Sequence, residues 1–444
     1  MNTTQVILGL ILGIGVLIFL TVKLKVHAFF SLIGASVTFG LVSGMGMAKM
    51  LEAFTSGIGG TIAGIGVVIA LGTVTGALLE KSGAAETMAR TILKITGEKH
   101  AALGLAITGY FVSIPVFCDS AYVLLAPIAK RLSRDTKISM TTMAVSLAMG
   151  LHATHMLVPP TPGPLSVAGI LNADLGMVIC IGALVSVPVT LAGYLVAKAL
   201  GKKYYYIPQD VQDVPESQNI PTPLMAFLPI LTPIVLMLGK TIGDMTGVEN
   251  GFMNFMNIVG EPMVALMIGL FMALITYFKI FPKDYSVWGF DGAFGEALKT
   301  AGQIVLIVGA GGAFGSVLKA SPLQDILTNA FSGLEIGILA PFIIGFIFRT
   351  CVGSATVAMV TAATMISPLL DVLGMVTPMG RVIAMLACAA GGFMVYHGND
   401  DFFWVVTSTS EMDTSTAYKT LPLASIAQSM VALVMVFILK TILL

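Results

Sequence analysis

Residues 113–127 read SIPVFCDSAYVLLAP, an apolar run that an acid and a hydroxyl interrupt at Asp119 and Ser120, between two prolines. Such a break is unfavourable in lipid, because backbone groups that leave the helix find no water there. A second break, CVGSATVA at residues 351–358, occurs in the later half of the chain. Interrupted apolar segments in corresponding positions of two halves point to the binding site of a transporter. We call these stretches the first tip (113–127) and the second tip (351–358), and we expect a carrier whose site lies between them.

The composition is typical of a membrane protein. Of the 444 residues, 56% are hydrophobic and only 10% are charged, and the mean hydropathy is +0.95. A soluble domain carries roughly 25% charged residues. The net charge of zero gives no indication of a nucleic acid or an acidic partner. The four cysteines lie inside apolar runs without metal-ligand spacing, so we expect small core residues rather than disulfides or a metal site.

The apolar runs predict an all-α polytopic protein, since a helix needs about 20 apolar residues to span a bilayer. We expect at least ten spans, with an amino-terminal run too long for a signal peptide as the first of them. Spans are predicted at roughly 5–22, 27–44, 61–79, 101–117, 139–157, 175–199, 223–239, 261–279, 301–318, 336–350, 380–396 and 423–443. Broken or re-entrant segments are predicted near 118–130, 354–370 and 400–410.

A polar, proline-containing stretch at residues 201–222 divides the chain and has the composition of a solvated linker. It separates an amino-terminal transmembrane repeat, residues 1–200, from a carboxy-terminal one, residues 223–444. Gly76–Ser82 aligns with Gly315–Ser321, and the two tips align at nearly the same offset. This predicts an internal duplication, although a chance match of small residues is the alternative.

The distribution of charge predicts that the two repeats are inverted. Four basic residues follow the first tip at positions 130–137, whereas the matching stretch 371–381 contains only Asp371 and Arg381. Cytoplasmic loops collect Lys and Arg. Matching loops therefore lie on opposite sides of the membrane, and the fold class we expect is two inverted-topology repeats with broken helices at the substrate site.

Ionisable residues at membrane depth are functional candidates by default. Asp119 is either a proton or cation site or a cap on the following helix. His152 and His155 share one helix face. His155 precedes the prolines of residues 158–164 (the proline box), where the chain must unwind and leave backbone groups free for ions and anions. We expect His155 to handle protons and His152 to hydrogen-bond between helices.

In the second half, residues 397–404 read HGNDDFFW and occupy the place of the proline box. They form either a cation or proton site or a helix end at the interface, which Trp404 favours. Ser354 and Thr356 offer hydroxyls to a ligand, or bond back to their own helix. Arg349 could meet a substrate carboxylate, but snorkelling to the interface is the favoured interpretation.

These considerations give a predicted site without catalytic or metal-binding residues. The residues expected to contact the substrate are Asp119, Ser120, Thr161, Gly163, Ser354, Thr356 and Asn399. Those expected to couple transport to protons are Asp119, His155 and Asp400. No phosphate-binding loop, zinc-protease motif or cysteine pair is present, and Gly309–Gly312 lies inside a predicted span, where small residues allow close helix packing.

Four blocks of sequence resemble the gluconate permease (GntP) family of bacterial inner-membrane symporters. They are residues 114–125, 159–164, 353–357 and 397–404. The resemblance implies proton-coupled uptake of small hydroxylated monocarboxylates such as gluconate or glycerate, with D-serine as a variation. It also implies membership of the ion-transporter superfamily, with inverted repeats, paired re-entrant hairpins and often a homodimer.

The chain departs from the family pattern in the stretches expected to face the ligand. Thr161 stands where the family usually has a histidine, and Cys118, Ser120 and Ala121 replace an aromatic residue, a valine and a glycine. These changes put gluconate itself and the handling of protons in question.

We therefore expect a secondary transporter of a small organic anion in the bacterial inner membrane, with no cofactor beyond a co-transported proton. An anion that moves inward against a negative interior needs a co-transported cation. A sodium-coupled dicarboxylate carrier is the first alternative, because carbonyls at the second tip could coordinate sodium instead. A channel or a membrane enzyme is disfavoured by the interrupted helices and the missing catalytic motifs.

Overall fold

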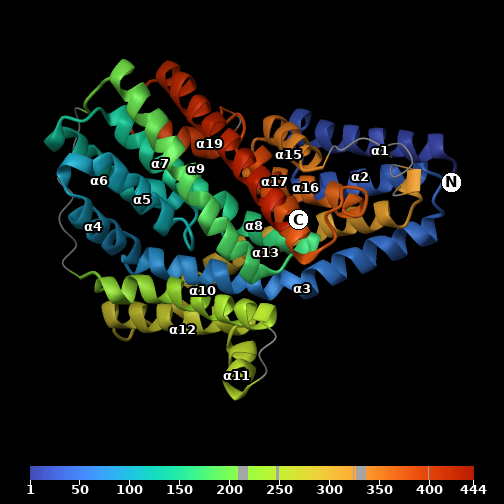
Figure 1. Ribbon diagram of the computed structural model, residues 1–444, viewed down its shortest axis with the longest axis horizontal. Coiled ribbons are helices and arrows are strands. Elements are labelled where there is room, and N and C mark those ends of the chain that lie inside the picture. Colours follow the sequence, from blue (N-terminus) through green and yellow to red (C-terminus); the bar gives the residue numbers. More distant parts are fainter. Residues whose placement is uncertain (209–218, 247–249, 324, 327–336, 399) are drawn as a thin grey trace.

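The computed structural model describes residues 1–208, 219–246, 250–323, 325–326, 337–398 and 400–444, and this part of the chain contains helices but no strands. Figure 1 shows the helices packed into one elongated bundle. The helices of the first half are α1 (Thr3–Ile18), α2 (Ala28–Val42), α3 (Met47–Lys81), α4 (Ala84–Thr96), α5 (Ala101–Val112), α6 (Cys118–Thr136), α7 (Met140–Leu157), α8 (Pro162–Leu171) and α9 (Leu175–Lys203). Those of the second half are α10 (Pro223–Thr246), α11 (Gly251–Val259), α12 (Pro262–Ile280), α13 (Ala293–Lys319), α15 (Leu339–Val352), α16 (Ala355–Ile366), α17 (Pro378–Gly392), α18 (Asp401–Thr409) and α19 (Thr414–Leu443).

Seven helices of the described chain are long and apolar enough to cross a membrane, fewer than the ten or more spans expected. They are Thr3–Thr21, Met47–Lys81, Leu175–Lys203, Pro223–Asp244, Pro262–Ile280, Tyr285–Lys319 and Thr414–Leu443. Other predicted spans coincide with shorter apolar helices such as α15 and α17. The shortfall has a physical reason, because several apolar runs form only half of an interrupted helix.

Four helix breaks confirm the interrupted segments and add detail to them. Within the first half they lie between α5 and α6 and between α7 and α8. Within the second half they lie between α15 and α16 and between α17 and α18. The predicted broken segments correspond to α6, α16 and α18, while α4, α8 and α11 were not predicted as separate helices. The breaks matter because each creates a helix amino terminus inside the bundle, where backbone amides point at whatever occupies the interior.

The two halves repeat the same order of elements in opposite directions. Helices α3 and α13, which carry the aligned sequences ending at Ser82 and Ser321, pack antiparallel. Near one end Gly57 of α3 faces Ser316 of α13. At the other end Lys81 pairs with Glu296 at 2.7 Å. Helices of each half also pack on the long helix of the other half: α2 packs on α13, and α12 packs on α3. Equivalent helices that run in opposite directions are the arrangement expected of an inverted repeat. The boundaries of the repeats at residues 200 and 223 remain a prediction, and part of the linker lies outside the described residues.

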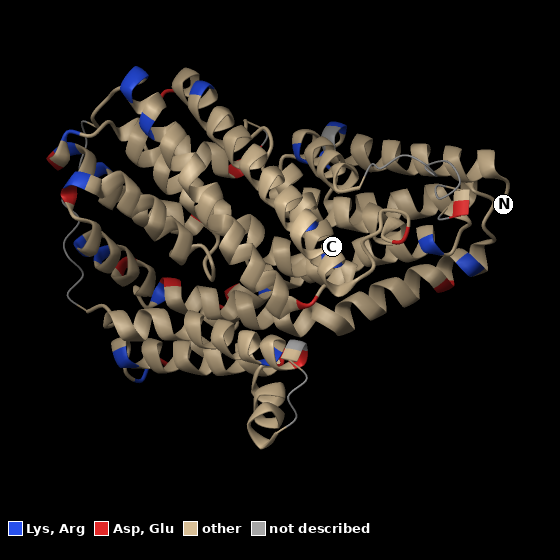
Figure 2. Cartoon of the chain, in the orientation of Figure 1, with Lys and Arg blue, Asp and Glu red and all other residues tan. Residues whose placement is uncertain are grey.

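Helix α7 is enclosed by other helices, and every one of its residues is buried. Helices α5 and α9 pack on it through small residues: Gly150 of α7 faces the carbonyl of Ala106, and Gly182 of α9 faces the carbonyl of Leu157. Small residues let helix backbones approach closely in membranes, where van der Waals packing replaces the hydrophobic effect between helices. Figure 2 shows that the charged residues lie mostly at helix ends and in loops.

Candidate functional site

The structure brings together four helix breaks rather than the two tips alone. Each tip packs against the second break of the other half, so α6 contacts α18 and α8 contacts α16. On the α8 side, a Cβ added at Gly163 would lie 3.8 Å from the Thr356 hydroxyl oxygen. On the α6 side, the Tyr122 hydroxyl is 2.5 Å from the hydroxyl of Ser410, which follows α18. These two contacts add the second break of each half to the expected pair of tips, and each contact contains one break from each half.

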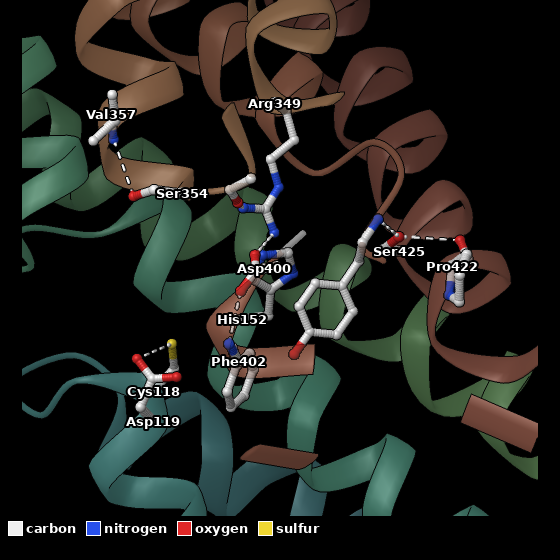
Figure 3. A network of polar contacts seen from close by, with 12 residues as sticks. Cys118, Asp119, His152, Arg349, Ser354, Val357, Asp400, Phe402, Pro422 and Ser425 are labelled. Atoms are coloured by element: carbon white, nitrogen blue, oxygen red, sulfur yellow. Dashed lines mark hydrogen bonds and ion pairs between the residues drawn. The ribbon is translucent and has the colours of Figure 1, made fainter. Parts of the chain in front are cut away.

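A buried ion pair between Arg349 and Asp400 lies at this meeting point (Figure 3). Arg349, in the last turn of α15, is only 1% exposed. Its guanidinium also donates to the carbonyl oxygen of Gly353 at the second tip, and its carbon Cζ lies 5.8 Å from the centre of the Tyr396 ring. Snorkelling of Arg349 to the interface, the favoured interpretation from the sequence, is wrong because the polar partners of this side chain are inside the bundle.

Asp400 combines two roles that were considered as alternatives. It is the N-cap residue of α18, and its carboxylate accepts a hydrogen bond from the backbone amide of Phe402 at 2.8 Å. It is also buried and holds the Arg349 guanidinium. The interfacial interpretation of residue 400 is thus wrong, although Trp404, one turn further along α18, is 45% exposed. Asn399 lies outside the described residues, so its predicted contact with substrate stays a prediction.

Several buried polar atoms around this ion pair have no hydrogen-bond partner within the described residues. They are Oδ1 of Asp119, Nε2 of His152, Nδ1 of His155, Nε of Arg349 and the hydroxyl of Tyr396. These groups are close enough for charge–charge interactions: Asp119 interacts with Asp400, and both histidines interact with Arg349. Most buried polar groups in folded proteins are hydrogen-bonded, so a group of exceptions in one place indicates a polar ligand or water.

The two histidines of α7 face different parts of this region. His152 approaches Oε1 of Gln428 on α19 through Nδ1 at 3.4 Å and stacks on the Tyr396 ring at 5.3 Å. It thus makes the contact between helices that was expected of it. The His155 ring lies 6.4 Å from the Phe117 ring at the first tip. Helix α7 therefore contacts Tyr396, which lies beside Arg349, through His152, and the first tip through His155.

At the first tip, Asp119 lies in the first turn of α6, next to Cys118 (Figure 3). The N-cap residue of α6 is Phe117, without a side-chain cap, so Asp119 is not the N-cap residue but lies one position inside the helix start. A carboxylate in the first turn is still stabilised by the positive end of the helix dipole. The Ser120 side chain lies near the carboxylate of Glu80 on α3, a neighbour that the sequence did not indicate.

The predicted residues of the proline box are buried. The Thr161 hydroxyl is 3.0 Å from the carbonyl oxygen of His155 and 2.7 Å from that of Val158. It thereby satisfies carbonyls that the end of α7 leaves free. Thr161 also lines a small cavity of about 10 Å³ together with Phe117 of the first tip, roughly the space of one water molecule. Gly163 is buried against α16, as described above.

At the second tip, Ser354 and Thr356 begin α16. Ser354 is exposed and is the N-cap residue, and its hydroxyl oxygen accepts from the Val357 amide at 3.5 Å (Figure 3). Thr356 is half-buried and faces Gly163 across the contact between the halves. Among the described residues, no group of three or more His, Cys, Asp or Glu side chains could hold a metal ion.

Several residues of the polar network around the Arg349–Asp400 ion pair were not predicted from the sequence. Tyr396, Gln428 and Glu80 were not considered, and Arg349 was placed in the wrong environment. A signal did exist for three of them: Arg349, Gln428 and Glu80 are polar residues inside or at the end of strongly apolar runs. Polar groups at such positions usually have partners inside the protein.

Comparisons with known proteins agree with this architecture. The family model described as GntP family permease matches residues 5–442. A permease of Haemophilus influenzae described as uncharacterized is 37% identical over 90% of this chain and 85% of its own length. A gluconate permease of Pseudomonas aeruginosa is 32% identical over 98% and 97% of the two chains. A D-serine transporter, DsdX, of Escherichia coli is 33% identical over 98% of both.

A solved structure shares the fold at low sequence identity. The YdaH transporter of Alcanivorax borkumensis, whose topology was described as unusual, superposes with a TM-score of 0.63. The match covers 89% of this chain and 90% of that one at 15% identity. The family model and the relatives identify a multi-pass membrane transporter, not an enzyme. The chain belongs to the GntP family of permeases.

Proposed function

We propose that this permease carries a small hydroxylated monocarboxylate into the bacterial cell together with a proton. The observation that carries the proposal is the buried Arg349–Asp400 pair, surrounded by polar atoms without partners. A buried cation among unsatisfied donors and acceptors suits a ligand that has one carboxylate and several hydroxyls. Relatives described as gluconate permeases and as a D-serine transporter bear names of such molecules, which supports this class of substrate.

The ion pair offers a way to link substrate and proton. While Asp400 is ionised, its carboxylate neutralises Arg349, and a substrate carboxylate would have to compete with it. A proton on Asp400 removes that competition and leaves Arg349 to bind the substrate. Because a buried charge without a partner is strongly destabilising, proton and anion bind cooperatively, and the coupling is reciprocal. The co-transported proton also offsets the cost of moving an anion against a negative interior, about 2.3 kcal/mol per 100 mV.

The other predicted residues supply the remaining contacts. Ser354 and Thr356 begin α16, and Asp119 and Ser120 begin α6, so the positive ends of two half-helices point toward the centre. The unpartnered atoms of His152, His155 and Tyr396 provide places for substrate hydroxyls or bridging water. Among the three predicted proton acceptors, Asp119, His155 and Asp400, the geometry favours Asp400 because it is the one that holds Arg349.

Uptake of labelled gluconate and of D-serine into proteoliposomes, with and without an inward proton gradient, tests the proposal. The Asp400→Asn variant should lose accumulation driven by the proton gradient but retain exchange of substrate across the membrane, because the amide imitates the protonated acid. The matched control is Asp291→Asn, at a side chain that is 98% exposed. Transport that depends on a sodium gradient and ignores the proton gradient would instead support a sodium-coupled carrier. Equal accumulation by Asp400→Asn and the parent protein would remove Asp400 from the coupling.

A further inference from the structure

A basic cavity lies far from the helix breaks, at the end of the molecule where α9 terminates. It has a volume of about 320 Å³ and is formed by the start of α5, the turn between α6 and α7, and the last turns of α9. Its polar lining is dominated by positive side chains. The basic residues are Lys99, His100, Lys137, Lys198 and Lys202, with Tyr194 and Tyr205 beside them.

These lysines have no acidic partner in the part of the chain that the structure describes. No Asp or Glu lines the cavity, and no ion pair involves its lysines. Other lysines differ, since Lys81 pairs with Glu296 and Lys130 pairs with Glu411, at 2.7 Å and 2.6 Å. An unneutralised cluster of cations around a cavity is a site for an anion, because the mutual repulsion of the cations is relieved when an anion binds.

An apolar stripe runs along the exposed face of α9 toward the cavity. Exposed aliphatic residues recur every three or four positions and lead directly to the lysines, which places all of them on one helix face. The stripe consists of Leu184, Val187, Leu191 and Leu195, which are 47–61% exposed, followed by Lys198 and Lys202. A free phosphate would use only the basic end of this surface. A molecule with a negative head and hydrocarbon chains would use all of it.

We propose that this surface binds an anionic phospholipid, with the head group in the basic cavity and the acyl chains along the α9 stripe. Lys and Arg are concentrated at this end of the molecule, as the upper left of Figure 2 shows, so it faces the cytoplasm by the positive-inside rule. Basic pockets between transmembrane helices on that side are suited to anionic lipid head groups. The site is separate from the substrate site, so it does not depend on the proposed function.

Native mass spectrometry of the purified full-length permease, first stripped of lipid, tests the proposal. The protein is titrated with dioleoyl phosphatidylglycerol, dioleoyl phosphatidylcholine, or glycerol phosphate as a head group without chains. The Lys198→Gln/Lys202→Gln variant should bind phosphatidylglycerol roughly 10-fold or more weakly than the parent protein. A Lys198→Arg/Lys202→Arg variant should keep the affinity, since it keeps the charge, and shows that a loss is not caused by misfolding.

The neighbouring residue provides a matched control. Lys203 lies next to Lys202 but outside the cavity, with its ammonium 5.4 Å from the Tyr204 ring. Lys23→Gln/Lys203→Gln removes the same amount of charge and should bind phosphatidylglycerol within twofold of the parent protein. Three results would overturn the proposal: equal affinity in the Lys198→Gln/Lys202→Gln variant, equal affinity for phosphatidylcholine, or glycerol phosphate binding as tightly as the complete lipid.

Discussion

The two halves differ in how one point of the long helix packs: the first half is closed around Gly76, whereas the second half leaves a cavity beside the equivalent glycine. On α3, a Cβ added at Gly76 would collide with the Pro115 carbonyl of the first tip, whereas one turn away Gly72 and its equivalent Gly311 are equally tight, each 2.9 Å from its nearest neighbour. On α13, the equivalent of Gly76 is Gly315, and the nearest atoms to its Cβ are those of Thr364, at 3.5 Å.

Gly315 borders a polar cavity of about 310 Å³, which α3, the end of α8, α13 and Ser367 enclose. Lys319 lines this cavity, while its equivalent in the first half, Glu80, lies near Ser120 of the first tip. The two repeats therefore differ in whether the space beside the long helix is filled or open. Alternating access requires such a difference, because one repeat must be closed while the other admits substrate. The following substitutions test this asymmetry, beginning with the largest expected effect.

Arg349→Ala should have the largest effect, because it leaves the Asp400 carboxylate buried without a partner and frees the Gly353 carbonyl. Breaking a buried ion pair from one side costs about 3–5 kcal/mol. We expect loss of transport and a lower unfolding temperature in detergent. The Arg349→Ala/Asp400→Asn double variant should recover much of the stability but not the transport. If the double variant is no more stable than Arg349→Ala, the ion pair does not hold the second tip.

Gly76→Ala and Gly315→Ala form a matched pair at equivalent positions. The methyl group at position 76 meets the backbone of the first tip, and overpacking of this kind costs about 1–3 kcal/mol. Transport by Gly76→Ala should fall at least tenfold, whereas Gly315→Ala should remain near the parent protein. Uptake rates and thermal unfolding of both variants measure the difference. Equal losses would show that the two halves are equally closed in the membrane.

Ser316→Cys and Ala77→Cys, again at equivalent positions, compare access from water. Ser316 lines the polar cavity, so a cysteine there should react several-fold faster with a membrane-impermeant maleimide than a cysteine at position 77. Each rate is measured against the parent protein, which contains four native cysteines. Addition of substrate should change the two rates in opposite directions if the repeats alternate. Identical rates at both positions would contradict the asymmetry.

Ser120→Ala should have the smallest effect. It removes the hydroxyl that lies near the Glu80 carboxylate in the closed half, and the expected loss is at most about 0.5–1.5 kcal/mol. Ser354→Ala, at the equivalent place in the second tip, weakens only the cap of α16 and should lower stability by a similar or smaller amount. Denaturation midpoints in detergent compare the two. A clearly larger loss for Ser354→Ala would place the closed contacts at the second tip instead.

The sequence predicted the elements of this fold better than their partners. Apolar length located most of the helices, and the prolines and polar residues located the breaks, because both depend on local interactions with lipid and water. The number of full spans was overestimated since half-helices such as α5 and α15 also form apolar runs. The pairing of α6 with α18 and of α8 with α16 depends on contacts between distant segments, which no local pattern encodes.

The candidate site illustrates the same limit. Asp119, His155 and Asp400 were singled out because charge at membrane depth is rare. Arg349 is equally recognisable in the sequence as a charge within an apolar run, but the sequence does not show that Asp400 lies beside it. Without that partner, an interfacial position was the simpler interpretation. Contacts between the predicted residues and a substrate stay a prediction, and Asn399 lies outside the described residues.

The complete enclosure of α7 has a consequence for biogenesis. With its histidines, threonines and serine, α7 is absent from the seven helices apolar enough to cross a membrane unaided, and no residue of it is exposed. Such a helix gains little from lipid. It should therefore enter the bilayer only after α9 has been synthesised and can cover it. Nascent chains that end before residue 175 should fail glycosylation-reporter tests for stable insertion of α7, and those that extend beyond residue 203 should pass.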